Sequence, residues 1–274
     1  MILDLTQGFG DFPEYKLFKF PDGSIKFELK KDIEFRVSTG NMIVVKTTLR
    51  SNDDLFVLAL VRSVIKRRYV NVNTILRIDY MMYQQDDRLF NDSESFGLKV
   101  VCDFINTMQW DRVQIFHPHS DKVEFIDNCE IIDNRAFIKD VMSNHNRFDT
   151  HWIIPDAGAF KTQFKQLTTM DYPNFVTCMK SRDHVTGDIS TVVNTTDLEG
   201  KDCIIFDDIC LGGNTFIQIA QELRKKNCGK LYLAVSHGVF NKGVEHLYEY
   251  FDRIYTTDSI CSLESSDKLR ITMI

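Results

Sequence analysis

The sequence has little proline, no surplus of basic residues and no long apolar run. Its five prolines among 274 residues leave no proline-rich linker. The longest apolar run, residues 55–61, is far shorter than the ~20 residues of a membrane-spanning helix. The net charge of −6 argues against a nucleic-acid partner, because such proteins need Lys and Arg to neutralise phosphates. We therefore expect no membrane partner and no nucleic-acid partner.

The cysteines show no pattern of pairing. There are seven, which is an odd number, and they are scattered without a C-x-x-C pair. This spacing argues against a disulfide framework and against a structural zinc site. The first residues, Met1 to Asp4, include an acid where a secretory signal peptide would carry basic residues. These features predict a protein of the reducing cytoplasm.

Strand-like apolar runs alternate with amphipathic stretches along the whole chain. In the first half the expected elements, in order, are 42–47, 51–68, 74–79, 95–108 and 112–116. In the second half they are 135–143, 152–154, 175–179, 203–206, 215–226 and 230–235. Strands that alternate with helices predict a mostly parallel sheet flanked by helices. Two such units, divided near residue 135, predict two similar α/β halves.

The helix over 51–68 has the clearest periodicity. Ser51 or Asn52 can cap its first turn, and the basic run 66–68 closes it in the way that a helix dipole favours. Its apolar residues recur at helical spacing and are Leu55, Leu58, Val61 and Ile65. This face is expected to pack on the sheet.

Polar residues follow several of the predicted strands. They lie at 83–88, 117–119, Asp156, 207–215 and His237. In open parallel sheets, ligands bind beyond the carboxyl ends of the strands. The sequence therefore predicts that the functional residues are among these segments.

The segment 203–215 carries the most informative pattern. Asp207 and Asp208 follow an apolar strand, and Gly212 and Gly213 lead the chain into a helix. Backbone N–H groups at such a turn bind phosphate, and carboxylates accept hydrogen bonds from ribose hydroxyls. The pattern indicates a sugar-phosphate site, although strand-end acids that cap the next helix give the same spacing.

This segment resembles the ribose-binding loop of type I phosphoribosyltransferases and, more closely, that of the ribose-phosphate diphosphokinases. Further segments resemble the second family in family order, from about residue 20 to residue 260. They are FPDG at 20–23, YMMYQQDDR at 80–88, DRVQIFHPHS at 111–120, PDAG at 155–158, KSR at 180–182, SHGVF at 236–240 and TDSI at 257–260.

The resemblance implies two tandem domains with the type I phosphoribosyltransferase fold, over 1–135 and 136–274. The first domain would carry the ATP-side loops, and the second the ribose-phosphate loop and the catalytic loop. The family uses Mg²⁺ and transfers the β,γ-diphosphate of ATP to the anomeric hydroxyl of a ribose phosphate, with release of AMP. Its ATP site is shared between subunits, which implies a homo-oligomer whose other partners are small-molecule substrates.

The resemblance also implies roles for individual residues. Lys180 and Arg182 would be catalytic, because phosphoryl transfer depends on charge neutralisation. The ATP-binding residues would be Phe20, Asp22, Gln85, Asp87, Arg88 and His119. The ribose-phosphate-binding residues would be Asp207, Asp208, Gly212, Gly213, Asn214 and Thr215. His119 and Asp156 would bind or orient Mg²⁺, for which a carboxylate is a natural ligand.

The sequence departs from the family pattern in the ribose loop, where the third acid is Leu211 and the first threonine is Gly212. A lost threonine hydroxyl removes a hydrogen bond worth about 1.5–3 kcal/mol to a charged acceptor. Gly212 also leaves room, so a phosphate with a further substituent would be tolerated better than a bare monoester. The expected acceptor is therefore ribose 5-phosphate or ADP-ribose, the latter in a branch that feeds NAD synthesis.

The ATP side departs as well, since the family's Arg-Gln is Gln85-Asp86 and its Glu after Asp-Gly is Ser24. Two other functions stay open: a phosphoribosyltransferase, and a catalytically silent regulatory relative. Without the resemblance, Lys180 and Arg182 would be a solvated surface pair. His237 can be explained by a hydrogen bond at a strand end and is not assigned a catalytic role.

Overall fold

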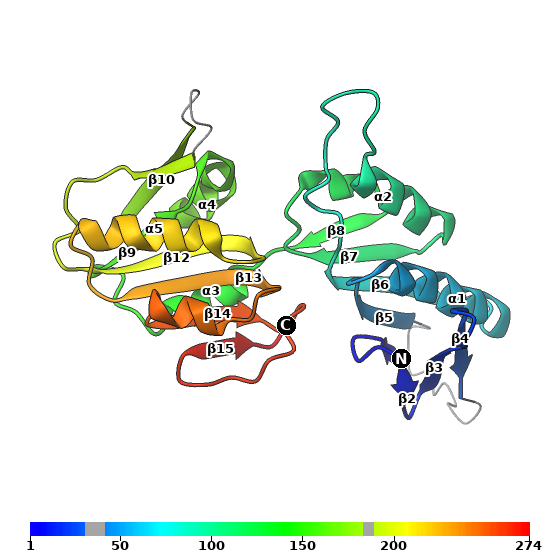
Figure 1. The fold of residues 1–274 in the computed structure, drawn as a ribbon. Helices are drawn as coiled ribbons and strands as arrows, with labels where there is room; N and C mark the ends of the chain where they lie inside the picture. Colours follow the sequence, from blue (N-terminus) through cyan, green and yellow to red (C-terminus); the bar gives the residue numbers. More distant parts are fainter. Residues whose placement is uncertain (31–41, 183–188) are drawn as a thin grey trace. The chain divides into compact units, whose positions relative to one another are not determined.

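The computed structural model describes residues 1–30, 42–182 and 189–274. Within helices and strands, the side chains at 161–162 and 180–191 lie outside this description. The chain forms two compact units, Met1–Asp133 and Asn134–Ile274, which we call the first and second units (Figure 1). Each is described by itself.

The first unit contains a sheet in which every neighbouring pair of strands is parallel. Its strand order is β1 (Ile2–Asp4), β5 (Met42–Thr48), β6 (Asn73–Tyr80), β7 (Arg112–Phe116) and β8 (Cys129–Ile132). The helices α1 (Asn52–Arg68) and α2 (Gly97–Thr107) lie along this sheet (Figure 1), and the short 3₁₀ helix η1 (Asp121–Phe125) precedes β8.

Helix α1 confirms its prediction in both position and buried face. The backbone N–H of Ser51 donates to Asp54 Oδ2 at 2.7 Å, which closes a capping box at the first turn. The helix ends at Arg68 after three consecutive basic residues. The residues predicted for its apolar face are all buried: Leu55, Leu58, Val61 and Ile65.

A small antiparallel sheet in the first unit was not predicted from the sequence. It consists of β2 (Gly10–Asp11), β3 (Tyr15–Lys19) and β4 (Ile25–Leu29). Alternate side chains of β3 and β4 are buried in the same apolar core as the parallel sheet. An ion pair of 2.6 Å between Lys19 and Asp53 also ties this sheet to α1.

The second unit contains a larger sheet in which only β10 and β11 are antiparallel among the paired strands described. Its strand order is β11 (Ile189–Val193), β10 (Phe175–Arg182), β9 (Thr150–Ile154), β12 (Asp202–Cys210), β13 (Leu231–Gly238), β14 (Arg253–Thr257) and β15 (Leu269–Thr272). Its helices are α3 (Arg135–Met142), α4 (Ala157–Thr169), α5 (Asn214–Lys225) and the 3₁₀ helix η2 (Glu245–Glu249).

The side chains of β12 show that helices cover both faces of this sheet. Cys203 and Ile205 belong to the core that contains the buried face of α5, whereas Ile204 and Phe206 belong to the core that contains α3 and α4. Successive strand residues point to opposite faces, so α5 lies on one side and α3 with α4 on the other (Figure 1). The predicted α/β fold with mostly parallel, helix-flanked sheets is confirmed.

Strand β12 is longer than predicted. The sequence pattern placed its end at Phe206, whereas the strand continues through both aspartates to Cys210. The reason is its neighbour β13, which extends to Gly238 and pairs with Asp207, Ile209 and Cys210. Both acids therefore lie within the strand, with Asp207 paired to Val235.

Within the described ranges, no helix combines the length and the apolar character that crossing a membrane requires.

The seven cysteines are all free thiols, and one has an unusual environment. Cys228 follows α5 and is half-buried, and its thiol lies near the buried thiol of Cys203 and the Arg224 guanidinium. These neighbours lower the pKa of Cys228, against the effect of burial. By contrast, burial and two nearby glutamates raise the pKa of the half-buried Cys129 to about 11.

This contrast predicts that Cys228 is alkylated selectively. Since the thiolate is the nucleophile, the rate at which Cys228 reacts with iodoacetamide should reach half its maximum at a lower pH than for an ordinary thiol, while Cys129 stays unreacted below pH 9. Peptide mass spectrometry after timed labelling measures both sites in one sample. The Arg224→Ala variant should move the Cys228 midpoint to higher pH, and identical pH profiles at the two cysteines would contradict the prediction.

Candidate active site

The predicted adenine-binding residues Phe20 and Asp22 lie at the tip of the β3–β4 hairpin. The turn is closed by hydrogen bonds from Phe20 N to Ser24 O at 2.7 Å and from Gly23 N to Phe20 O at 2.9 Å. Gly23 has a φ of 88°, which glycine adopts without strain. Phe20 is 43% exposed, so its ring is available to another molecule.

Asp22 is held by its own turn. Its Oδ1 accepts hydrogen bonds from the backbone N–H of Ser24 at 2.9 Å and from the Ser24 hydroxyl at 2.7 Å. These bonds lower the pKa of Asp22. Ser24, which departs from the family's glutamate, therefore supports the turn that presents Asp22.

The structure brings the 83–88 segment together with His119 through Gln84. The buried Gln84 side chain donates to Met81 O at 2.5 Å and accepts from the backbone N–H of His119 at 2.6 Å. Both segments follow strands of the parallel sheet, β6 and β7. Two of the predicted ATP-side segments are thus one connected structure within the first unit.

Asp87 forms the second link between these segments. Its carboxylate accepts from the Ser120 hydroxyl at 2.9 Å and from Arg88 Nε at 3.1 Å. Burial acts to raise the pKa of Asp87, but these hydrogen bonds outweigh it and lower the pKa. Arg88 itself is 65% exposed, so most of its guanidinium faces solvent.

Gln84 was missed by the sequence analysis, which selected its neighbour Gln85. Gln85 is exposed, whereas Gln84 is 2% exposed and fully hydrogen-bonded into the loop. Two adjacent glutamines look alike in a sequence, and only the direction of the chain after Tyr83 decides which one is buried. Tyr83 has a φ of 64°, a left-handed conformation that the residue type does not indicate.

In the second unit, Asp156 is the N-cap of α4. Its Oδ1 accepts a hydrogen bond from the backbone N–H of Ala159 at 3.0 Å. The prediction of Asp156 as a Mg²⁺ ligand stays a prediction, and this bond fixes the position of the carboxylate. Its partner in that prediction, His119, belongs to the first unit.

Asp207 and Asp208 are both half-buried at the carboxyl end of β12. Asp207 Oδ1 accepts from the backbone N–H of Asp208 at 3.0 Å, and Asp208 Oδ1 accepts from that of Ile209 at 2.7 Å. Neither of these bonds is to a backbone N–H in the N-terminal turn of α5. They therefore do not support the alternative in which the two acids cap that helix. The two carboxylates instead belong to consecutive residues near the carboxyl end of β12, a central strand of the sheet.

The N-terminus of α5 is formed by the predicted phosphate-binding turn. Gly213 is the N-cap, with a φ of 77°, and no side chain among the described residues caps the helix through a hydrogen bond. A Cβ on Gly213 would lie 2.6 Å from Leu247 Cδ2, so packing as well as φ requires glycine. Asn214 and Thr215 form the first turn of the helix.

Gly212 does not open free space, in contrast to the expectation from the sequence. A Cβ at this position would lie 3.3 Å from Asn241 Oδ1 and 3.3 Å from Lys242 Cε. These side chains come from the segment that follows β13. The position once expected to be empty is therefore bordered by a polar and a basic residue.

Lys180 and Arg182 lie in β10, where their backbones pair with Thr191 and Ile189 of β11. Their side chains lie outside the described part of the structure, as do residues 183–188. Their predicted catalytic roles stay predictions.

His237 has a structural role that agrees with its omission from the predicted site. It is fully buried, and its Nδ1 lies 2.8 Å from the Ser259 hydroxyl. Among the residues that the structure describes, no group of three His, Cys, Asp or Glu side chains is arranged as a metal site.

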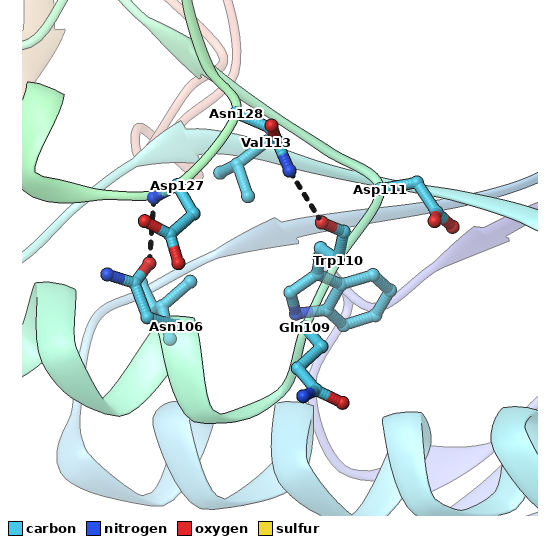
Figure 2. Close-up of a pocket in the computed structure, with 8 residues that line it drawn as sticks. Asn106, Gln109, Trp110, Asp111, Val113, Asp127 and Asn128 are labelled. Carbon is cyan, nitrogen blue, oxygen red and sulfur yellow. Dashed lines mark hydrogen bonds between the residues drawn. The ribbon is translucent and has the colours of Figure 1, made fainter.

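A cavity of about 320 Å³ lies at the opposite, amino-terminal edge of β7 and β8 (Figure 2). Figure 2 shows Asp127 N–H bonded to Asn106 at 2.8 Å, and Asn128 donating to Trp110 O at 3.5 Å. None of the predicted site residues lines this cavity. It is therefore separate from the candidate active site.

No protein-family model matches the chain. The chain is 27% identical to the ribose-phosphate pyrophosphokinase of Pyrococcus furiosus over 248 residues, which cover 88% of this chain and 84% of that protein. It is 24% identical to the ribose-phosphate pyrophosphokinase of Vibrio cholerae over 253 residues, which cover 88% of this chain and 77% of that protein.

The fold also matches a solved structure of the same kind. The phosphoribosylpyrophosphate synthetase of Mycobacterium smegmatis superposes with a TM-score of 0.80 at 18% identity, over 94% of this chain and 85% of that one. The structural likeness concerns the fold, and the sequence matches extend over most of both chains. In sequence and in fold the chain is therefore similar to the ribose-phosphate diphosphokinases, the family that its motifs resemble.

Proposed function

We propose that this chain transfers the β,γ-diphosphate of ATP to the anomeric hydroxyl of a ribose 5-phosphate moiety. The hydroxyl oxygen attacks the β-phosphorus, the bond from that phosphorus to the α–β bridging oxygen breaks, and AMP leaves. The hydroxyl proton is lost in the same reaction. Such a transfer needs positioned charges more than covalent catalysis.

The observation that carries this proposal is the end of β12. Two adjacent carboxylates stand beside a helix N-terminus that has no side-chain cap. The unsatisfied N–H groups of that turn suit the 5-phosphate, and Asp207 and Asp208 suit the ribose hydroxyls. The chemistry of this edge fits a sugar phosphate better than it fits an uncharged ligand.

We propose ADP-ribose as the acceptor in preference to ribose 5-phosphate. Gly212 offers the phosphate no hydroxyl, and Leu211 is apolar and 37% exposed. A bare phosphate monoester would lose a charged hydrogen bond at this position, worth about 1.5–3 kcal/mol. A phosphate esterified to a further group gains contacts beyond the loop that offset this loss.

ATP would bind to the connected segments of the first unit, with Arg88, Asp87, Gln85 and His119 as the predicted contacts. Mg²⁺ fits the side chains available, since Asp156, Asp207 and Asp208 supply hard carboxylate oxygens. The bound ion would neutralise phosphate charge during transfer. The exposed hairpin tip with Phe20 and Asp22 supports a homo-oligomer in which it contacts ATP on a neighbouring subunit.

The acceptor assay tests the proposal directly. The protein, ATP and Mg²⁺ are incubated with ADP-ribose or with ribose 5-phosphate, and AMP is measured. We expect AMP with ADP-ribose at a higher kcat/KM than with ribose 5-phosphate. Rapid AMP formation with ribose 5-phosphate alone would reject the ADP-ribose acceptor. No AMP with either acceptor would favour the silent regulatory relative or the phosphoribosyltransferase.

Replacing the predicted catalytic cations tests the mechanism. Lys180→Ala and Arg182→Ala should each lower kcat by about 10²–10³-fold, because each removes a charge that stabilises the transferring phosphates. Circular dichroism should show an unchanged fold. Lys230→Ala, at an exposed residue directly before β13, is the matched control. Turnover in either variant equal to that of the control would assign the catalytic role to other residues.

Gln84→Leu tests whether the buried glutamine positions the ATP-side loop. The variant leaves the His119 N–H without its acceptor, so KM for ATP should rise about tenfold while KM for the acceptor stays constant. Gln114→Leu, which removes a side chain on β7 that donates a hydrogen bond to Glu130, is the control. An equal rise in both KM values would indicate general destabilisation instead.

A further inference from the structure

The segment 239–247, which follows β13, packs directly on the ribose-phosphate loop. Asn241 N donates to Leu211 O at 3.1 Å, and His246 Nε2 donates to Gly212 O at 3.1 Å. The loop and the segment are therefore fixed to each other by hydrogen bonds from both ends of the segment. Side chains of 239–247 that border the loop have defined positions relative to it.

Lys242 is a basic residue of this segment, and its side chain lies beside Gly212 of the ribose-phosphate loop. Its Cε would be 3.3 Å and its Cδ 3.4 Å from a Cβ placed on Gly212. A side chain at position 212 would therefore press against Lys242, which would have to shift by a few tenths of an ångström. In this chain the loop therefore has a lysine side chain beside the position where the threonine hydroxyl is missing.

The ammonium group of Lys242 is available to a ligand. The residue is exposed, and it forms no hydrogen bond or ion pair with any residue that the structure describes. The nearby Glu245 carboxylate borders Gly243, where a Cβ would lie 2.5 Å from its Oε2. An unpaired cation beside an uncapped helix N-terminus makes this edge attractive to more than one phosphoryl group.

We infer that Lys242 binds the second phosphoryl group of a diphosphate-linked acceptor and thereby selects ADP-ribose over ribose 5-phosphate; this rests on the proposed function. The N–H groups at Gly213 and the first turn of α5 bind the phosphoryl group on ribose C5. Lys242 borders Gly212 of the same loop, so its ammonium group would bind the phosphoryl group that is esterified to the first one. Ribose 5-phosphate has no second phosphoryl group that Lys242 could bind.

If Lys242 bound the phosphoryl group on ribose C5 instead, its removal would affect the two acceptors differently from what we expect. An ammonium group that replaced the missing threonine hydroxyl would bind the phosphoryl group that both acceptors share. Its removal would then weaken both acceptors equally. The ratio between the two acceptors, and not the size of one effect, is therefore the quantity to measure.

The experiment compares the full-length wild type with Lys242→Ala, Lys242→Arg and the control Lys225→Ala, which is at the other end of α5 and pairs with Glu222. AMP formation is measured with ADP-ribose and with ribose 5-phosphate at saturating ATP and Mg²⁺. Lys242→Ala should lower kcat/KM for ADP-ribose roughly tenfold to a hundredfold. The values for ribose 5-phosphate and KM for ATP should change less than threefold, and Lys242→Arg should retain most activity.

Titration calorimetry with ADP-ribose and with ribose 5-phosphate separates this inference from the proposed function. Tighter ADP-ribose binding by the wild type than by Lys242→Ala, in protein that forms no AMP, would support Lys242 and reject the reaction. AMP formation with an equal loss for both acceptors, or with no loss in Lys242→Ala, would reject Lys242 and leave the reaction in place. Absence of ADP-ribose binding by the wild type would overturn the inference.

Discussion

The pairing of β12 with β9 on one side and β13 on the other is the constraint on which the candidate site depends. A strand fixed along both edges and covered by helices on both faces cannot slide or tilt without breaking the core. Asp207 pairs with Val235 of β13, and Asp208 lies between two paired residues of the same strand, so the positions of both acids are set by the sheet rather than by a loop. The chain then enters α5 through Gly213, where packing against Leu247 and a positive φ leave one geometry. The acids and the helix N-terminus are therefore presented together.

Much of this arrangement could be predicted from local sequence. The spacing of apolar residues predicted α1 and its buried face, and the alternation of strands with helices predicted the parallel sheets. The segments that the rule for parallel strands selected do follow strands of these sheets, and their functional roles stay predictions. These predictions succeed because they rest on residues close together in the chain.

The features that the sequence did not reveal all depend on distant partners. The end of β12 is set by β13, and the burial of Gln84 rather than Gln85 is set by the loop that carries His119. The β2–β3–β4 sheet is short, and it becomes recognisable only through the core that its alternate residues share with the parallel sheet. Lys242 lies some thirty residues beyond the loop that it borders, and nothing in its own neighbourhood indicates a role.

The hairpin that presents Phe20 and Asp22 is held by bonds within five consecutive residues and anchored to α1 by Lys19. Its shape is complete in the isolated subunit, so a second molecule that docks there meets a preorganised surface. Most of the conformational entropy that flexible loops lose on association has already been lost during folding. Contact between subunits at this tip would then be governed by their concentration and by the complementarity of the two surfaces, and it would require no refolding of either one.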